Sequence, residues 1–415
     1  MMCRRFFVAA FAALALAACA HGDAMQPAPP AATGETITIL ISLDGFRPDY
    51  LDRGITPALS DLADNGVRAA MQSSFPSVTF PNHYTLVTGL HPGRHGLVNN
   101  RMEDAERPGA VFTLQDRAVA ADPIWWADGV PIWVTAERQG VRTGTMFWPG
   151  SEYELHGQRP TRWRTFDQGL PGFARVDVLL SWLDLGEAER PRFFTLYFDL
   201  VDTAGHRYGP DALETNAAIA EVDAAIGRLV AGLDARGYAG RVNFVIAADH
   251  GMAAQAPDAI IDLDARITPQ QARVIWDGQF TGIQPLAGQE AAVEQALLGR
   301  SDRGECWRKA DVPARFDYST HRRIPAIVCL ADIGWRYRSS QLQQYATPAP
   351  GAHGWDPQAP DMAAVFIANG PAFRRGATLP PFENVSVYPL LARLIGVEPE
   401  AHQGDLADVQ PALAE

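Results

Sequence analysis

The chain has 415 residues, of which 47% are apolar and 20% are charged, and its formal net charge is −13. This length allows one large core, with or without an inserted lobe, and the composition excludes general disorder. Such an acidic protein is a poor general binder of nucleic acid or anionic lipid, so we expect no nucleic-acid partner. A site for an anionic substrate would need local positive charge, for which bound cations are the obvious source.

Residues 1–18 have the pattern of a secretory signal peptide. A basic start is followed by an apolar run that is too short to span a membrane. The run ends in Leu-Ala-Ala-Cys, which resembles the bacterial lipobox, so we favour a lipidated Cys19 over a chance cysteine at an ordinary cleavage site. Ala20 after this cysteine suggests an outer-membrane lipoprotein in the periplasm. The Pro- and Ala-rich segment 19–34 is expected to be its extended tether.

Near-continuous apolar runs predict strands that are covered on both faces. They lie at residues 36–44, 192–202, 242–249 and 363–368, with a weaker candidate at 141–147. Helices are predicted at 56–66 with Thr56 as N-cap, from Thr79 onward, at 212–235 and at 387–395. This alternation predicts an α/β fold with a mostly parallel central sheet, helices on both faces, and ligands beyond the carboxyl ends of the strands.

The pattern is looser between the third and fourth of these strands. We interpret residues 260–345 as a smaller inserted lobe over the site, which leaves 35–259 and 346–415 for the catalytic domain. The lobe contains Cys306 and Cys329, the cysteines outside the signal and lipobox. An even pair in an exported chain predicts one disulfide, and two buried thiols are the alternative.

A hydroxyl residue, Thr79, stands where a turn leads into the second helix. Pro81 suits the first helical position, because a helix start would leave its missing N–H unpaired anyway. The hydroxyl would lie beside free N–H groups and the positive end of the helix dipole, which together attract anions. The commoner role of Thr before a helix is that of an N-cap, and this stretch alone favours the cap.

Acidic and histidine residues gather where the predicted strands end. Each has a plainer explanation alone, because Asp is a common turn former and a single His is more often solvated than a ligand. Their joint occurrence favours metal binding, since Asp oxygen and His nitrogen are the usual zinc donors where Cys is absent. The residues of this set are Asp44, Asp202, His206, Asp249, His250 and His353.

These residues lie in sequence blocks that resemble the nucleotide pyrophosphatase/phosphodiesterase family of the alkaline phosphatase superfamily. The blocks occur in family order from the first strand almost to the end of the chain. They are Asp44-Gly-Phe-Arg, Thr79-Phe-Pro-Asn-His-Tyr-Thr-Leu-Val-Thr-Gly, His95-Gly-Leu-Val-Asn-Asn, Phe147-Trp-Pro-Gly-Ser, Asp202-Thr-Ala-Gly-His-Arg-Tyr-Gly-Pro, Asp249-His-Gly-Met and Gly351-Ala-His-Gly.

The resemblance implies an alkaline phosphatase-like fold and two zinc ions. One ion would be held by Asp44, Thr79, Asp249 and His250, and the other by Asp202, His206 and His353. A metal beside Thr79 would lower the pKa of its hydroxyl, which would attack phosphorus and form a phosphothreonine intermediate.

The resemblance also implies substrate contacts. Asn100 and the backbone N–H of Phe80 would hold the phosphate, and Tyr197 and Phe166 would stack a nucleobase. The family's Glu-Glu-Pro before the next ligand is Asp199-Leu-Val here, which bears on contacts to the leaving group and base. The remaining histidines, including His83, His95 and His321, are interpreted as structural.

Alternative activities are weighed on the same residues. A sulfatase would need a Cys or Ser in a setting that Thr79-Phe-Pro lacks, and the apolar Phe80 disfavours a phosphomonoesterase. Among diesters, Tyr197 favours nucleotides over choline or lipid head groups, although strand packing explains this tyrosine equally well. A surface lipoprotein that only binds is disfavoured by the complete set of ligands.

Overall fold

The computed structural model describes residues 36–113, 115–342 and 349–414. The predicted signal peptide, Cys19 and the whole of the tether lie outside these described residues. Among the described helices, none combines the length and apolar character needed to cross a bilayer.

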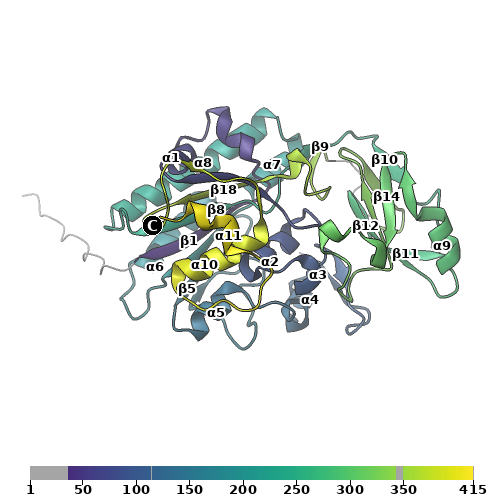
Figure 1. Ribbon diagram of the computed structural model, residues 1–415, viewed down its shortest axis with the longest axis horizontal. Helices are drawn as coiled ribbons and strands as arrows, with labels where there is room; N and C mark the ends of the chain where they lie inside the picture. The colour runs from purple at the N-terminus through teal and green to yellow at the C-terminus, as the bar shows by residue number, and fades with distance from the viewer. Residues whose placement is uncertain (1–35, 114, 343–348, 415) are drawn as a thin grey trace, which may run out of the picture.

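The described residues build a mixed central sheet of nine strands (Figure 1). Strands β8, β1, β7, β5 and β6 are all parallel, whereas β18 runs antiparallel to β8 and β2. The α/β class is therefore confirmed, and the antiparallel direction of β18 is a detail that its apolar run could not reveal. In spatial order the strands are β19 (Ala377–Thr378), β2 (Val67–Gln72), β18 (Ala364–Asn369), β8 (Val242–Ala247), β1 (Ile37–Leu43), β7 (Phe193–Phe198), β5 (Thr143–Met146) and β6 (Arg162–Trp163), and β20 (Phe382–Glu383) also pairs with β2.

Helices cover this sheet in two groups (Figure 1). Helices α1, α6, α7 and α8 pack against one another, and α2, α5, α10 and α11 form the second group. The α-helices are α1 (Pro57–Asp64), α2 (Thr79–Thr88), α3 (Pro92–His95), α4 (Arg117–Ala120), α5 (Ile132–Arg138), α6 (Gly172–Leu183), α7 (Leu200–Tyr208), α8 (Leu213–Asp234), α9 (Glu290–Leu297), α10 (Val387–Ile395) and α11 (Leu406–Val409). Short 3-10 turns are η1 (Pro48–Arg53), η2 (Pro123–Trp126), η3 (Lys309–Asp311), η4 (Ala314–Phe316), η5 (Pro360–Met362), η6 (Asn384–Ser386) and η7 (Gln410–Ala412).

Three local predictions need correction. The apolar run 192–202 is a strand only to Phe198, because the chain then turns into α7, which carries Asp202. Pro81 is the third residue of α2 rather than the first, since the helix starts at Thr79 and Val78 is the N-cap. Thr56 does precede α1, but its hydroxyl donates to the carbonyl of Leu51 instead of capping the helix.

A second sheet forms the part drawn in green at the right of Figure 1. It has an apolar core of its own, which includes Val274, Ile283 and Ile327 and is distinct from the core of the central sheet. Its strands, in spatial order, are β11 (Ala272–Trp276), β12 (Phe280–Pro285), β15 (Ile327–Ala331), β14 (Gly304–Arg308) and β13 (Gly299–Ser301). Three further pairs join β10 (Ile260–Asp262) to β16 (Arg336–Arg338), β17 (Gly351–Ala352) to β9 (Ala253–Ala254), and β3 (Met102–Glu103) to β4 (Val111–Phe112).

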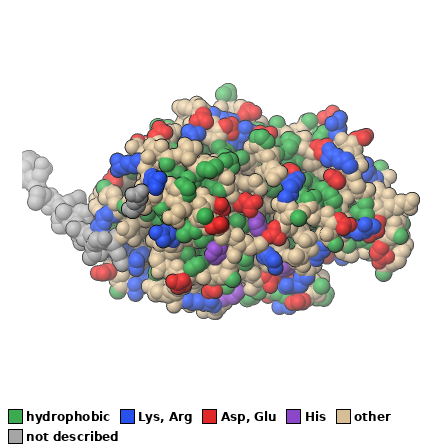
Figure 2. Space-filling model, in the orientation of Figure 1, with side chains coloured by type: hydrophobic (Ala, Val, Ile, Leu, Met, Phe, Trp, Pro, Cys, Tyr) green, Lys and Arg blue, Asp and Glu red, His purple; other side chains and the backbone are tan. Residues whose placement is uncertain are grey.

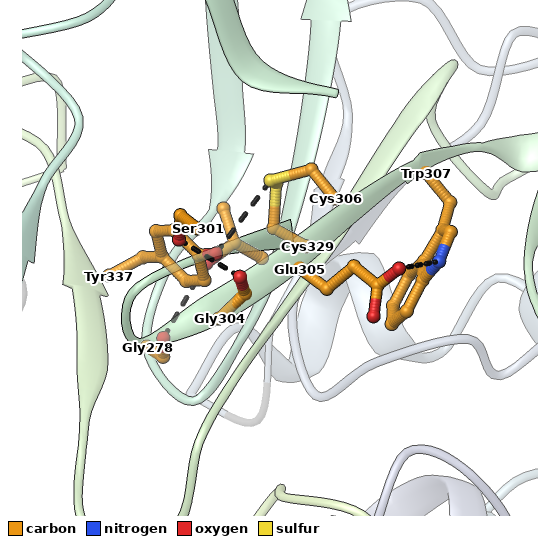
Figure 3. The surroundings of a disulfide bond; sticks show 9 residues. Gly278, Ser301, Gly304, Glu305, Cys306, Trp307, Cys329 and Tyr337 are labelled. Atoms are coloured by element: carbon orange, nitrogen blue, oxygen red, sulfur yellow. Dashed lines mark hydrogen bonds between the residues drawn. A yellow bond between two sulfur atoms is a disulfide. The ribbon is translucent and has the colours of Figure 1, made fainter. Parts of the chain in front are cut away.

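A disulfide joins Cys306 to Cys329 inside the second sheet (Figure 3). The two residues are directly opposite each other on β14 and β15, and both are buried. The disulfide prediction therefore holds, and the alternative of two free thiols does not.

The surface carries both signs of charge. On the face shown in Figure 2, Lys and Arg side chains are interspersed with Asp and Glu side chains.

The N-terminus of helix α1 is capped by a side chain of another helix, α8. The carboxylate of Asp223, which is buried on α8, accepts hydrogen bonds from the backbone N–H groups of Ala58 (3.1 Å) and Leu59 (2.8 Å). These two groups belong to the first turn of α1, where no helical carbonyl can reach them. Asp223 thus does the capping that the sequence assigned to Thr56.

We expect Asp223→Ala to lower the free energy of unfolding by about 2 kcal/mol, because it leaves two N–H groups at a helix start without their partner. Chemical denaturation measures this change. Glu221→Gln, at an exposed position of the same helix, is the matched control and should unfold like the unaltered protein. Equal stability of Asp223→Ala and this control would contradict the capping role.

Candidate active site

The parallel pairing of β1 and β8 brings the first group of acidic and histidine residues together. Asp44 directly follows β1, and Asp249 and His250 come after β8 with one residue between. All three therefore lie at the same edge of the sheet. The Gly45 N–H donates to Asp249 Oδ1 at 3.2 Å, which ties the two strand ends to each other. Neighbouring parallel strands thus place residues from distant parts of the chain side by side.

The side chains of this first group converge. His250 Nε2 lies 3.0 Å from Asp249 Oδ2 and 3.5 Å from Asp44 Oδ1, and all three side chains are buried. Thr79, the first residue of α2, places its Oγ1 3.3 Å from the same imidazole nitrogen. The hydroxyl therefore lies against the group, and Thr79 is not the helix cap, because Val78 occupies that position.

A second group forms next to it. Asp202 and His206 lie one turn apart on α7, and His353 follows β17. His353 Nε2 is 3.1 Å from His206 Nε2 and 3.6 Å from Asp202 Oδ1. The imidazoles of His250 and His353 stack with their centroids 3.6 Å apart, which places the two groups side by side.

The three imidazoles of these groups are oriented in the same way. The Nδ1 atoms of His206, His250 and His353 lie 2.9, 2.9 and 2.8 Å from the backbone carbonyls of Gly351, Gly251 and Ser77. A carbonyl only accepts, so each Nδ1 donates its proton to that carbonyl. Each Nε2 then faces the carboxylates, and it is the atom that a metal ion would take as its ligand.

The charges within the two groups are not balanced by the protein alone. Asp44 Oδ1, Asp202 Oδ1 and Asp249 Oδ2 are buried and accept no hydrogen bond among the described residues. Burial and the nearby carboxylates of Asp249 and Asp202 raise the pKa of Asp44 well above its usual range. Burial and the neighbouring imidazoles lower the pKa of His353. Divalent cations would remove both penalties, so the residues present fit a metal site.

His83, which the sequence analysis leaves as structural, lies directly beneath this site. It is fully buried, with Nδ1 2.9 Å from the carbonyl of Thr79 and 3.3 Å from Asp249 Oδ2, and with Nε2 2.7 Å from Ser42 Oγ. It supports two residues of the first group without joining it. His95 and His321, which are also interpreted as structural, lie outside both groups, with His95 beside Thr85 and His321 beside Asp128.

The two predicted phosphate-holding groups meet at the start of α2. The Phe80 N–H donates to Asn100 Oδ1 at 2.9 Å. Because this bond already uses the amide oxygen, the amide nitrogen is the atom of Asn100 that remains for a phosphoryl oxygen.

A cavity of about 990 Å³ opens from the two groups. Thr79, Asp44 and Asp202 line its inner end. Its aromatic lining consists of Phe80, Trp126, Trp148, Tyr153, Phe166 and Tyr197. Of this aromatic lining, only Phe166 and Tyr197 are predicted from the sequence to stack a base. Tyr153 lies three residues after the Trp-Pro-Gly block, and this proximity could have identified it as a further lining residue.

The two predicted base-stacking residues have different surroundings. Phe166 is half-buried in the cavity wall, with its ring 5.9 Å from that of Tyr197. Tyr197 is only 8% exposed, and its hydroxyl donates to Asp44 Oδ2 at 2.5 Å. Tyr197 therefore also orients a carboxylate of the first group, which sequence reasoning missed.

Asp199, where the chain departs from the family's Glu-Glu-Pro, forms a buried ion pair. The guanidinium of Arg175 lies 2.7 Å from its carboxylate and also donates to the carbonyl of Tyr197 at 2.9 Å. Asp199 thus helps to fix the end of β7 at the cavity wall.

The comparisons with known proteins agree with this geometry. A model of the type I phosphodiesterase/nucleotide pyrophosphatase family matches residues 38–356. The chain is 38% identical over 390 residues to an uncharacterized pyrophosphatase/phosphodiesterase of Schizosaccharomyces pombe, which covers 91% of this chain and 80% of that protein. It is 33% identical over 400 residues to ectonucleotide pyrophosphatase/phosphodiesterase family member 3 of Rattus norvegicus, of which it spans less than half (45%), with 93% of this chain covered.

A solved structure is similar over its whole length. It is an inactive threonine-to-alanine variant of murine ectonucleotide pyrophosphatase/phosphodiesterase 5 in complex with AMP, with a TM-score of 0.85 and 31% identity over 92% of this chain and 100% of that one. The predicted alkaline phosphatase-like fold class is thereby confirmed. The chain belongs to the type I phosphodiesterase/nucleotide pyrophosphatase family of enzymes.

Proposed function

We propose that the chain is a zinc-dependent hydrolase that cleaves phosphodiester and pyrophosphate bonds of nucleotides and releases a nucleoside monophosphate. The observation that carries this proposal is the contact of the Thr79 hydroxyl with a group of buried carboxylate and imidazole ligands at the start of a helix. The Thr79 hydroxyl can therefore serve as the nucleophile of the proposed covalent step.

Two zinc ions would account for both groups of ligands. Asp44, Thr79, Asp249 and His250 would hold one ion, and Asp202, His206 and His353 the other. When bound, zinc supplies a Lewis acid that lowers the pKa of the hydroxyl and neutralises the substrate's phosphate.

The protein's own residues would then carry out a double displacement. Thr79 Oγ1 loses its proton and forms a bond to phosphorus while the bond from phosphorus to the leaving oxygen breaks, which produces a phosphothreonine and a leaving group that takes up a proton. A water oxygen then forms a bond to phosphorus while the bond between Oγ1 and phosphorus breaks, so that Oγ1 regains a proton and the nucleoside monophosphate is released. The amide nitrogen of Asn100 would bind a phosphoryl oxygen, on which charge develops in the transition state, while the Phe80 N–H holds the amide oxygen of Asn100.

The cavity supports a nucleotide as the substituent of this phosphate. Half-buried aromatic rings of Phe80, Tyr153 and Phe166 line a space large enough for a nucleoside. The murine relative was solved in complex with AMP, which supports the same class of ligand here. Choline or lipid head-group diesters are the second candidate, because aromatic rings also bind quaternary ammonium groups.

We expect Thr79→Ala to lower kcat on a p-nitrophenyl nucleotide diester by at least ~10³-fold, since no nucleophile remains. Thr79→Ser keeps the hydroxyl and is the matched control, which should retain substantial turnover. Near-normal turnover by Thr79→Ala would contradict the mechanism. The same assay with a p-nitrophenyl phosphocholine diester separates the two substrate classes, and we expect the nucleotide to have the higher kcat/KM.

Zinc should stabilise the protein after treatment with a chelator. Each bound ion removes the repulsion among buried carboxylates, so we expect added Zn²⁺ to raise Tm and calorimetric titration to give two ions per chain. Asp249→Ala should lose one of them, whereas Asp61→Asn, at an exposed position of α1, should bind both. Binding of fewer than two ions by the unaltered protein would contradict the two-zinc proposal.

We also propose that the protein is exported and anchored to the outer membrane through a lipid on Cys19. The disulfide between Cys306 and Cys329 supports an oxidising compartment. In a bacterial host, the chain should incorporate labelled palmitate and fractionate with membranes, and Cys19→Ser should do neither. Equal labelling of Cys19→Ser would refute the anchor.

A further inference from the structure

The loop that carries Asn100 is held on both sides by the part of the chain that contains the second sheet. Before Asn100, the carbonyl of Val98 accepts a hydrogen bond from the hydroxyl of Tyr318 at 2.6 Å. After it, Arg101 Nε donates to the carbonyl of Ile275 in β11 at 2.9 Å. The anchors lie two residues before and one residue after the predicted phosphate-binding amide.

A buried arginine strengthens the first of these anchors. The side chain of Arg323 is fully buried and donates from Nη1 to the carbonyl of Gly96 at 2.7 Å. It also donates to the carbonyls of Trp125 (3.0 Å) and Ile124 (2.6 Å), and its Nε lies 2.5 Å from Asp104 Oδ2. A guanidinium with this many fixed partners holds the backbone segments around it in one arrangement.

Side chains of the same segment, residues 318–323, pack directly against the backbone of the loop. Thr320 donates to the carbonyl of Gly93 at 2.7 Å. A Cβ on Gly96, whose φ is +80°, would lie 2.5 Å from His321 Nε2 and 2.8 Å from Arg323 Nη1. The glycine is therefore required both by its backbone conformation and by this contact.

We propose that residues 318–323, together with the Arg101 contact to β11, form a clamp that positions Asn100 for the phosphoryl group. The inference rests on the proposed function, because it concerns how Asn100 reaches its substrate. It assigns the second-sheet part of the chain an indirect share in catalysis, in which Tyr318 and Arg101 act as positioning residues through Asn100.

The physical reason lies in how precisely a transition-state donor must be placed. The side chain of Asn100 is only half-buried and is fixed at one end by the Phe80 N–H. Its other constraint is the path of its own backbone, which the anchors at Val98 and Arg101 determine. A shift of about 1 Å in such a donor costs up to ~10²-fold in rate.

A double-mutant cycle tests the clamp. We expect Tyr318→Phe, which removes one hydroxyl, to lower kcat on the nucleotide diester by about 10-fold with little change in KM, because the lost interaction is made in the transition state. In an Asn100→Ala background the same change should cost less than about twofold, since Asn100 is the route by which it acts. Arg101→Met should behave in the same way in both backgrounds.

Tyr337→Phe is the matched control, because this buried tyrosine also belongs to the second-sheet part but its hydroxyl faces the sulfur of Cys306 (Figure 3). It should leave kcat unchanged. The clamp is overturned if Tyr318→Phe and Arg101→Met both keep normal kcat, or if their effects simply multiply with that of Asn100→Ala. Normal turnover by Asn100→Ala would also overturn it, whereas the hydrolase assignment is tested separately by Thr79→Ala.

Discussion

The structure depends on the convergence of buried carboxylates and imidazoles at one edge of the central sheet. Three acidic oxygens point into this region without a hydrogen-bond donor, and the nearby histidines present their Nε2 atoms to it. Such an arrangement is costly in the free protein, because like charges repel and buried charges lack solvation. Bound cations would offset this cost, so the unfavourable charge arrangement itself indicates a metal-binding site.

The surrounding scaffold keeps this group in register. Parallel pairing of β1 with β8 and β7 aligns the strand ends, and α7 then adds two ligands one turn apart. Beneath them, His83 and Tyr197 bind to Asp249, Thr79 and Asp44. Asp44, Asp249 and the three histidines of the two groups thus each have a second contact that fixes their direction, as expected of metal ligands.

Much of the organisation is local in origin and is readable from the sequence. Long apolar runs predicted the strands, and helical periodicity predicted α8 and α10 to within a residue or two. The ligands could be named because strand ends in a parallel sheet share an edge, so that Asp44 and Asp249 had to be close. The disulfide could be predicted because Cys306 and Cys329 are the two cysteines that remain after the predicted signal peptide and lipobox, so each had one candidate partner.

What the sequence by itself determined was therefore the class of fold, the family and the residues that could bind metal, all of which follow from patterns over short windows. Only the tertiary structure decided that β7 stops at Phe198, that Asp223 caps α1 from another helix, and that residues 318–323 grip the loop before Asn100. The last two features are contacts between segments that lie far apart in the sequence, 220 residues in the case of Val98 and Tyr318. No local pattern encodes such contacts, because their free energy arises only when packing brings the partners together.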